Sequence, residues 1–159
     1  EHDPEEIFNN VNALVNKLKS YKSELFPDIC GVSITNQRET TVCWNKKTGK
    51  PYCNAIVWHD TRTSDIVKEI VKKYGSEDVL RKKCGLTVKT YFSAGKMKWI
   101  IDNIPAVKEK VKNKDFKDLC FGTVDSWLIY VNLHIFNCLF KRNLQVIITL
   151  TSQTRLELC

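Results

Sequence analysis

Hydrophobic residues recur every three or four positions near the start of the chain, which predicts an amphipathic helix. Asp3 is placed to cap it, Pro4 suits a first turn, and Glu6 has the spacing of a capping box. The pattern ends near residues 19–21. The predicted inward face contains Ile7, Phe8, Val11, Leu14, Val15 and Leu18.

Short apolar runs and further helical patterns alternate with turn residues in the next hundred positions. Strands are predicted at 29–34, 40–44, 55–58 and 119–121, with a hairpin return over 45–51. Helices are predicted from Thr63 or Ser64 to Gly75, over 76–83, from Ser93 to Ile104, from Pro105 onward, and from Thr123 or Asp125 through 127–130. This order favours a mixed α/β layer structure.

The last part of the chain, residues 131–159, loses clean periodicity, and the pattern assigns it no structure. The longest apolar stretch of the chain, 127–140, is interrupted by Asn132, His134 and Asn137, so no membrane span is predicted.

A polar segment, 36–39, directly follows the first predicted strand. Polar side chains at a strand end are poor core material, and α/β folds place ligands at such ends. Arg38 offers donors and Glu39 offers acceptors, which suits a polyol because each hydroxyl both donates and accepts. A local ion pair or a stabilised turn is the alternative interpretation.

The composition narrows the classes further. The net charge is +7, but the lysines between 108 and 117 alternate with acids, so a solvated face is preferred to a nucleic-acid site. The seven cysteines include no C-x-x-C pair, which argues against a zinc site and favours a reducing, cytoplasmic location. No metal site is predicted.

Several strings together resemble the glycerol kinases of the FGGY carbohydrate kinase family. They are Ser33-Ile-Thr-Asn-Gln-Arg-Glu-Thr-Thr-Val-Cys-Trp44, Thr48-Gly-Lys-Pro-Tyr-Cys-Asn-Ala-Ile-Val-Trp58, Tyr91-Phe-Ser93 and Phe121-Gly-Thr-Val-Asp-Ser-Trp-Leu-Ile129. The resemblance implies a partial actin-like, ribonuclease-H-like N-terminal domain over 1–130 and a divergent tail over 131–159.

The resemblance also implies a substrate site. Arg38 and Glu39 would bond the hydroxyls of glycerol, and Trp58 and Tyr91 would cover its carbons; the alternative for each aromatic is a place in the core. His59, Asp60 and Arg62 invite a catalytic interpretation, but a structural Asp60–Arg62 pair is preferred. Asp125 is interpreted as a helix cap. No catalytic residue is assigned.

Parts that the family uses for phosphoryl transfer are missing from this stretch. It holds no Asp-x-Gly-Thr hairpin and no Gly-Asp-Gln string. The parent enzyme would therefore use ATP and Mg²⁺ to phosphorylate glycerol, as a homo-oligomer, while this chain would bind neither well and be inactive alone. A non-catalytic glycerol-binding or subunit-interaction fragment is the alternative. An unpaired edge on strand 29–34 would make the isolated chain fold poorly.

Overall fold

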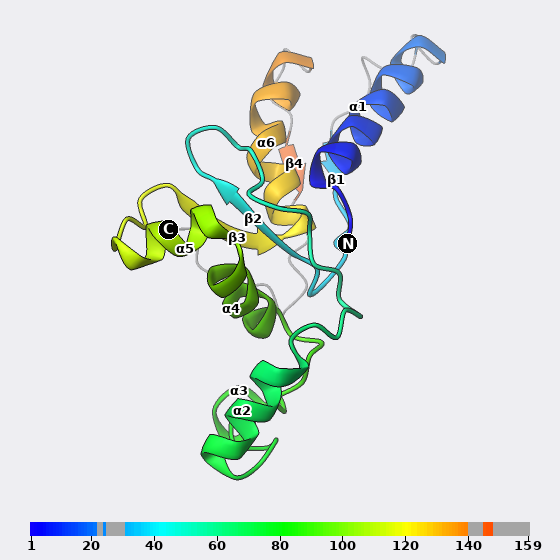
Figure 1. Cartoon of the computed structure of the whole chain (residues 1–159). Coiled ribbons are helices and arrows are strands. Elements are labelled where there is room, and N and C mark those ends of the chain that lie inside the picture. The colour runs from blue at the N-terminus through cyan, green and yellow to red at the C-terminus, as the bar shows by residue number, and fades with distance from the viewer. Residues whose placement is uncertain (22–23, 25–30, 140–144, 148–159) are drawn as a thin grey trace.

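A computed structural model describes residues 1–21, 24, 31–139 and 145–147 of the chain (Figure 1). Its helices are α1 (Pro4–Tyr21), α2 (Ser64–Tyr74), α3 (Arg81–Cys84), α4 (Ser93–Asn103), α5 (Pro105–Lys112) and α6 (Val124–Leu139). Its strands are β1 (Gly31–Ser33), β2 (Thr41–Asn45), β3 (Leu119–Thr123) and β4 (Gln145–Ile147).

The centre of the fold is the antiparallel pair β2–β3, in which Thr41 lies opposite Thr123 and Asn45 opposite Leu119. Alternate side chains of β2 enter two different cores. Val42 and Trp44 pack with the α6 residue Trp127, whereas Cys43 packs with residues of α4 and α5. Helices therefore cover both faces of the strand pair, α1 and α6 on one and α4 and α5 on the other (Figure 1). The predicted α/β layer structure is confirmed.

The predicted strand 55–58 is wrong beyond its first half. Ala55 exchanges two backbone hydrogen bonds with His2, and Ile56 exchanges two with Thr41. The chain then turns, because the amide of Asp60 bonds to the carbonyl of Val57. The result is a pair of isolated bridges that lead the backbone away from the strands at the point where Trp58 stands.

The first helix has the predicted cap but only part of the predicted buried face. Asp3 Oδ1 accepts the amide of Glu5 at 2.8 Å, and Phe8 meets the ring of Trp127 edge-on at 6.1 Å between centroids. Leu14 and Leu18, predicted to face inward, are 67% and 48% exposed. Only the first half of α1 packs on the core, since the second half extends past it (Figure 1).

The helix ends differ from prediction where side chains find other partners. Gly75 ends α2 as expected, at φ 80°, but Thr63 does not cap it and instead donates to the carbonyl of Thr90 at 3.5 Å. The predicted helix 76–83 shrinks to α3. Ser76 Oγ accepts the amide of Asp78 at 3.0 Å and so holds a turn where helix was expected.

Two features of the chain after residue 130 were not predicted by the hydrophobic pattern. Helix α6 continues to Leu139, and β4 pairs in parallel with β1, with Val32 opposite Val146. One edge of β1 is therefore covered. Residues 29–30, which belong to the predicted first strand, lie outside the described residues, as does most of 140–159. Across the described part of the chain, no helix has the length and apolarity to cross a membrane.

Candidate functional site

Glu39 stands in the turn that leads into β2, with its backbone in the left-handed region at φ 64°. A non-glycine residue there is uncommon and is held in place by its surroundings. Its Oε2 accepts both the amide and the hydroxyl of Ser93, at 3.2 and 3.1 Å. Ser93 is the first residue of α4, so the carboxylate also lies at the positive end of a helix dipole.

Arg38 is exposed beside Glu39. Over the described ranges the two side chains form no ion pair with each other, so the local ion pair that the sequence allowed is not the arrangement found. Both line the same cavity. The hydrogen-bond donors of the Arg38 guanidinium and the acceptors of the Glu39 carboxylate are thus placed at the same cavity.

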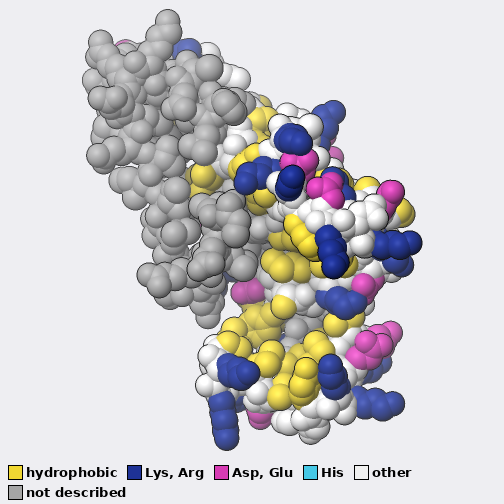
Figure 2. All heavy atoms as spheres, turned by 90° about the vertical axis from the view of Figure 1, so that its left-hand side faces the viewer, with side chains coloured by type: hydrophobic (Ala, Val, Ile, Leu, Met, Phe, Trp, Pro, Cys, Tyr) yellow, Lys and Arg dark blue, Asp and Glu magenta, His cyan; other side chains and the backbone are white. Residues whose placement is uncertain are grey.

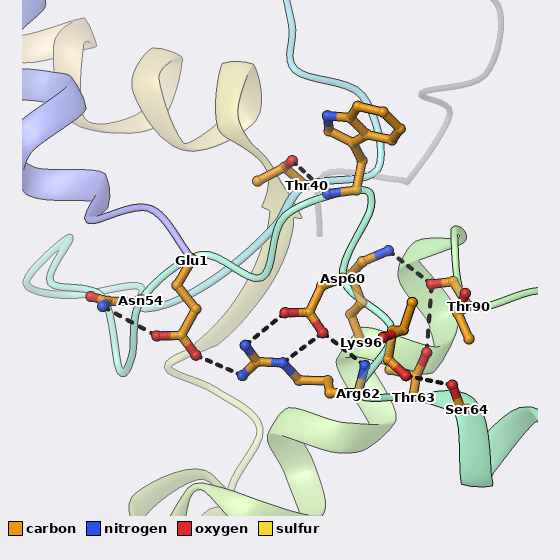
Figure 3. A network of polar contacts seen from close by, with 11 residues as sticks. Glu1, Thr40, Asn54, Asp60, Arg62, Thr63, Ser64, Thr90 and Lys96 are labelled. Atoms are coloured by element: carbon orange, nitrogen blue, oxygen red, sulfur yellow. Dashed lines mark hydrogen bonds and ion pairs between the residues drawn. The ribbon is translucent and has the colours of Figure 1, made fainter.

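Trp58 and Tyr91 come together from distant parts of the sequence. Their rings meet edge-on, 6.0 Å apart between centroids, and their exposed fractions are 44% and 37%. Neither is a core aromatic. The amide of Trp58 donates to Thr40 Oγ1 at 3.1 Å, which ties it to the residue after Glu39 (Figure 3). Tyr91 in turn lies two positions before Ser93, the partner of Glu39.

The cavity that Arg38 and Glu39 line has a volume of about 510 Å³, within the usual range of small-ligand pockets. Most of its wall is apolar, and hydrophobic side chains gather at the end of the molecule that α2 and α3 form (Figure 2). Trp58 and Tyr91 do not line it. The hydrophobic pattern predicted apolar faces on the helices but not the space between them. The apolar part of the cavity wall is formed by Ile66, Val67, Ile70, Leu86, Val88 and Met97.

Asp60 and Arg62 form the structural pair that the sequence favoured. Arg62 Nε and Nη2 reach the two carboxylate oxygens of Asp60 at 2.9 and 2.8 Å, and Nη1 reaches Glu1 at 2.6 Å (Figure 3). The guanidinium also lies over the ring of Trp99, 4.7 Å from its centroid. Hydrogen bonding to Arg62 lowers the pKa of Asp60 and of Glu1. These three charges are bonded to one another, which is a structural arrangement.

Lys96 was not singled out in the sequence, yet its side chain is fully buried. Its Nζ donates to the backbone carbonyls of Thr90, at 3.1 Å, and Tyr91. Burial lowers its pKa, against the attraction of Glu39 and Asp60. The available signal was its position one helical turn before the buried Ile100.

Asp125 is buried at the start of α6, and its carboxylate accepts hydrogen bonds from neighbouring residues. Its Oδ1 accepts the amide of Ser126 at 2.8 Å and the hydroxyl of Thr123, while its own amide donates to Asn36 Oδ1 at 3.3 Å. It stabilises the first turn of α6. Within the described ranges no three His, Cys, Asp or Glu side chains gather as metal ligands.

A strand pair with helices on both faces, and polar side chains at the end of an apolar run, is typical of the α/β domains that place ligands at strand ends. Residues 1–138 match the model of the FGGY family of carbohydrate kinases, N-terminal domain, and the chain belongs to that family.

Relatives of known kind agree with this membership. Glycerol kinase of Limosilactobacillus reuteri is 45% identical over 131 residues, which are 82% of this chain and 25% of that protein. Glycerol kinase 1 of Thermotoga maritima is 48% identical over 130 residues, 82% of this chain and 26% of that protein. The crystal structure of Plasmodium falciparum glycerol kinase with ADP superimposes with a TM-score of 0.69 at 40% identity, covering 82% of this chain and 25% of that one. The chain thus spans about a quarter of the length of these relatives.

Proposed function

We propose that this chain is the glycerol-holding part of a glycerol kinase, an enzyme that transfers the γ-phosphoryl group of ATP to glycerol and forms sn-glycerol 3-phosphate. The observation that carries the proposal is that two hydrogen bonds tie the segment 38–40 to the ring pair Trp58–Tyr91: the amide of Trp58 donates to Thr40, and Glu39 accepts from Ser93, two positions after Tyr91. The family membership and the glycerol kinase relatives support the same substrate.

Each residue has a distinct task in this proposal. Ser93 engages Oε2 of Glu39, and over the described part of the chain Oε1 has no hydrogen-bond partner, so it is available to accept from a ligand hydroxyl. Arg38 supplies donors to hydroxyl oxygens. The exposed rings of Trp58 and Tyr91 offer apolar surface to the carbons of the triol.

Phosphoryl transfer also needs a phosphate cradle, a metal ion and a group that orients the attacking hydroxyl. In the parent enzyme ATP and Mg²⁺ would supply the phosphoryl group and neutralise its charge. Residues 1–159 hold no Asp-x-Gly-Thr hairpin and no Gly-Asp-Gln string. We therefore expect purified 1–159 to produce no glycerol 3-phosphate from glycerol and ATP-Mg²⁺ in a coupled assay, and measurable turnover would contradict this.

Glycerol binding by the chain itself is the test of the proposed site. Titration of 1–159 with glycerol should raise its melting temperature, and Arg38→Ala should weaken the apparent affinity about tenfold or more, because a hydrogen bond from a charged donor contributes about 1.5–3 kcal/mol. Arg81→Ala is the matched control, since Arg81 is exposed on α3 and pairs with the nearby Asp78. Equal responses of the two variants would remove Arg38 from the site.

A further inference from the structure

A buried lysine, Lys96, donates a hydrogen bond to the backbone of Tyr91, one of the two residues of the ring pair. Lys96 stands in the first turn of α4, and its side chain is 0% exposed. A lysine in such a place is rare, because removing an ammonium from water is costly unless the charge is well bonded. Its presence therefore needs an account that a core aliphatic residue would not satisfy.

The bonds of the ammonium point to the segment that carries Tyr91. Lys96 Nζ donates to the carbonyl oxygens of Thr90 and Tyr91. The hydroxyl of Thr63 also reaches the carbonyl of Thr90 (Figure 3). Two consecutive carbonyls held by one cation fix the direction of the backbone between them. The Tyr91 ring leaves from this fixed backbone toward Trp58.

The charges around Lys96 are those of two carboxylates that have other hydrogen-bond partners. Glu39 and Asp60 both act on Lys96 as nearby negative charges. Glu39 is bonded to Ser93 and Asp60 to Arg62, and over the described residues no ion pair joins Lys96 to either carboxylate. The ammonium donates to the two carbonyls, and the two carboxylates act on it as nearby charges.

We propose that Lys96 is the positioning residue of the polyol site: its ammonium holds the Thr90–Tyr91 backbone so that the Tyr91 ring lies against Trp58. The substrate part of this inference depends on the proposed glycerol site, whereas the placement of the ring does not. Lys96 contacts neither the ligand nor the reacting atoms.

The test substitutes Lys96→Met, which keeps much of the side-chain length and removes the donors. In protein labelled with 5-fluorotryptophan, the ¹⁹F resonance of Trp58, assigned with Trp58→Phe, reports the neighbouring Tyr91 ring. We expect Lys96→Met to shift this resonance, leave that of Trp127 in place, and weaken glycerol binding about tenfold, the lower end of what loss of an outer supporting partner costs at metal sites. Ile100→Val, one turn along α4 and equally buried, should do neither.

The outcomes separate the two proposals. If 1–159 binds no glycerol but Lys96→Met still shifts the Trp58 resonance, the proposed function fails and the positioning role stands. If Lys96→Met leaves both the resonance and the glycerol affinity unchanged, the positioning role is overturned. Should Lys96→Met not fold, ¹³Cε-lysine spectra of the unchanged chain decide, at glycerol concentrations that raise its melting temperature. Bound glycerol should move the Lys96 signal and not that of the exposed Lys98, and a Lys96 signal that stays in place while glycerol binds contradicts the inference.

Discussion

At the scale of single residues, the ion pair of Asp60 and Arg62 shows how local geometry sets a pH dependence. Arg62 bonds both carboxylate oxygens of Asp60 and lowers its pKa. The folded state therefore holds the proton on Asp60 less tightly than the unfolded state does. The pair stabilises the fold above the unfolded-state pKa, about 4, and this contribution is lost as the pH falls through the folded-state value.

The prediction concerns Asp60→Asn. At pH 7 it should lower the free energy of unfolding by about 1 kcal/mol, the upper end for a well-formed ion pair at a surface, and the loss should shrink at pH 3. Urea unfolding at both pH values measures it. Asp65→Asn, which removes a more exposed partner of Lys68, should have a smaller effect at pH 7. An equal loss at both pH values for Asp60→Asn would contradict the electrostatic account.

The sequence identified residues whose chemistry is unusual for their place. Arg38 and Glu39 could be selected because polar side chains follow an apolar run, and Trp58 and Tyr91 because strings around them resemble a family. It did not identify Lys96, because a lysine among lysines looks solvated until the fold buries it. The distance between Trp58 and Tyr91 was equally out of reach, since it depends on how two loops meet.

At the scale of elements, hydrophobic spacing predicted most helices and the strand pair, and local competition explains the misses. The segment 76–80 has helical residues, but the Ser76 hydroxyl takes the Asp78 amide and favours a turn. The predicted strand at 55–58 ends after Ile56, because the amide of Trp58 donates to the side chain of Thr40 and not to the backbone of a neighbouring strand. Such bonds to side chains are invisible to a pattern of hydrophobicity.

The strand pair itself offers a test of packing. A Cβ added to Gly122 in β3 would lie 3.0 Å from both Ser126 Cβ and the Trp44 ring. Gly122→Ala should therefore destabilise the chain by about 1–3 kcal/mol, the usual cost of overpacking, as measured by urea unfolding.

Trp44→Phe supplies the control for this clash. Trp44 Nε1 is buried and has no hydrogen-bond partner among the described residues, so the smaller ring removes an unsatisfied donor while it makes room for the new methyl group. The double variant Gly122→Ala/Trp44→Phe should lose less stability than the sum of the two single losses. Strict additivity would show that the strain lies elsewhere, against Ser126.

At the scale of the whole molecule, several large apolar side chains face solvent. Leu14, Leu18 and Tyr21 lie along the far half of α1, and Tyr74, Leu80 and Leu86 lie around the end formed by α2 and α3 (Figure 1). Groups of exposed apolar residues mark surfaces that pack against something else. This supports the expectation that the chain on its own folds poorly or associates.

The expectation is checked by heating 1–159 while its mass is followed by light scattering. We expect a broad or irreversible transition and growth of larger species, with both reduced by Leu14→Lys combined with Leu18→Lys on the exposed half of α1. A sharp, reversible melt of a compact monomer would contradict it. Persistence of association in the double variant would instead point to the α2–α3 end.

The carboxylate of Glu39 joins two parts of the chain that are otherwise separate in sequence, because its Oε2 receives the first amide of α4 while its Oε1 is left for the proposed site. Phe92, which precedes that helix, provides no cap of its own. A ligand hydroxyl bound at Oε1 leaves the bond to the helix in place, whereas one bound at Oε2 competes with the helix. Amide hydrogen exchange at Ser93 thus becomes a gauge of occupancy: faster exchange on adding glycerol means that ligand and helix share one acceptor oxygen, and slower exchange means that each has its own.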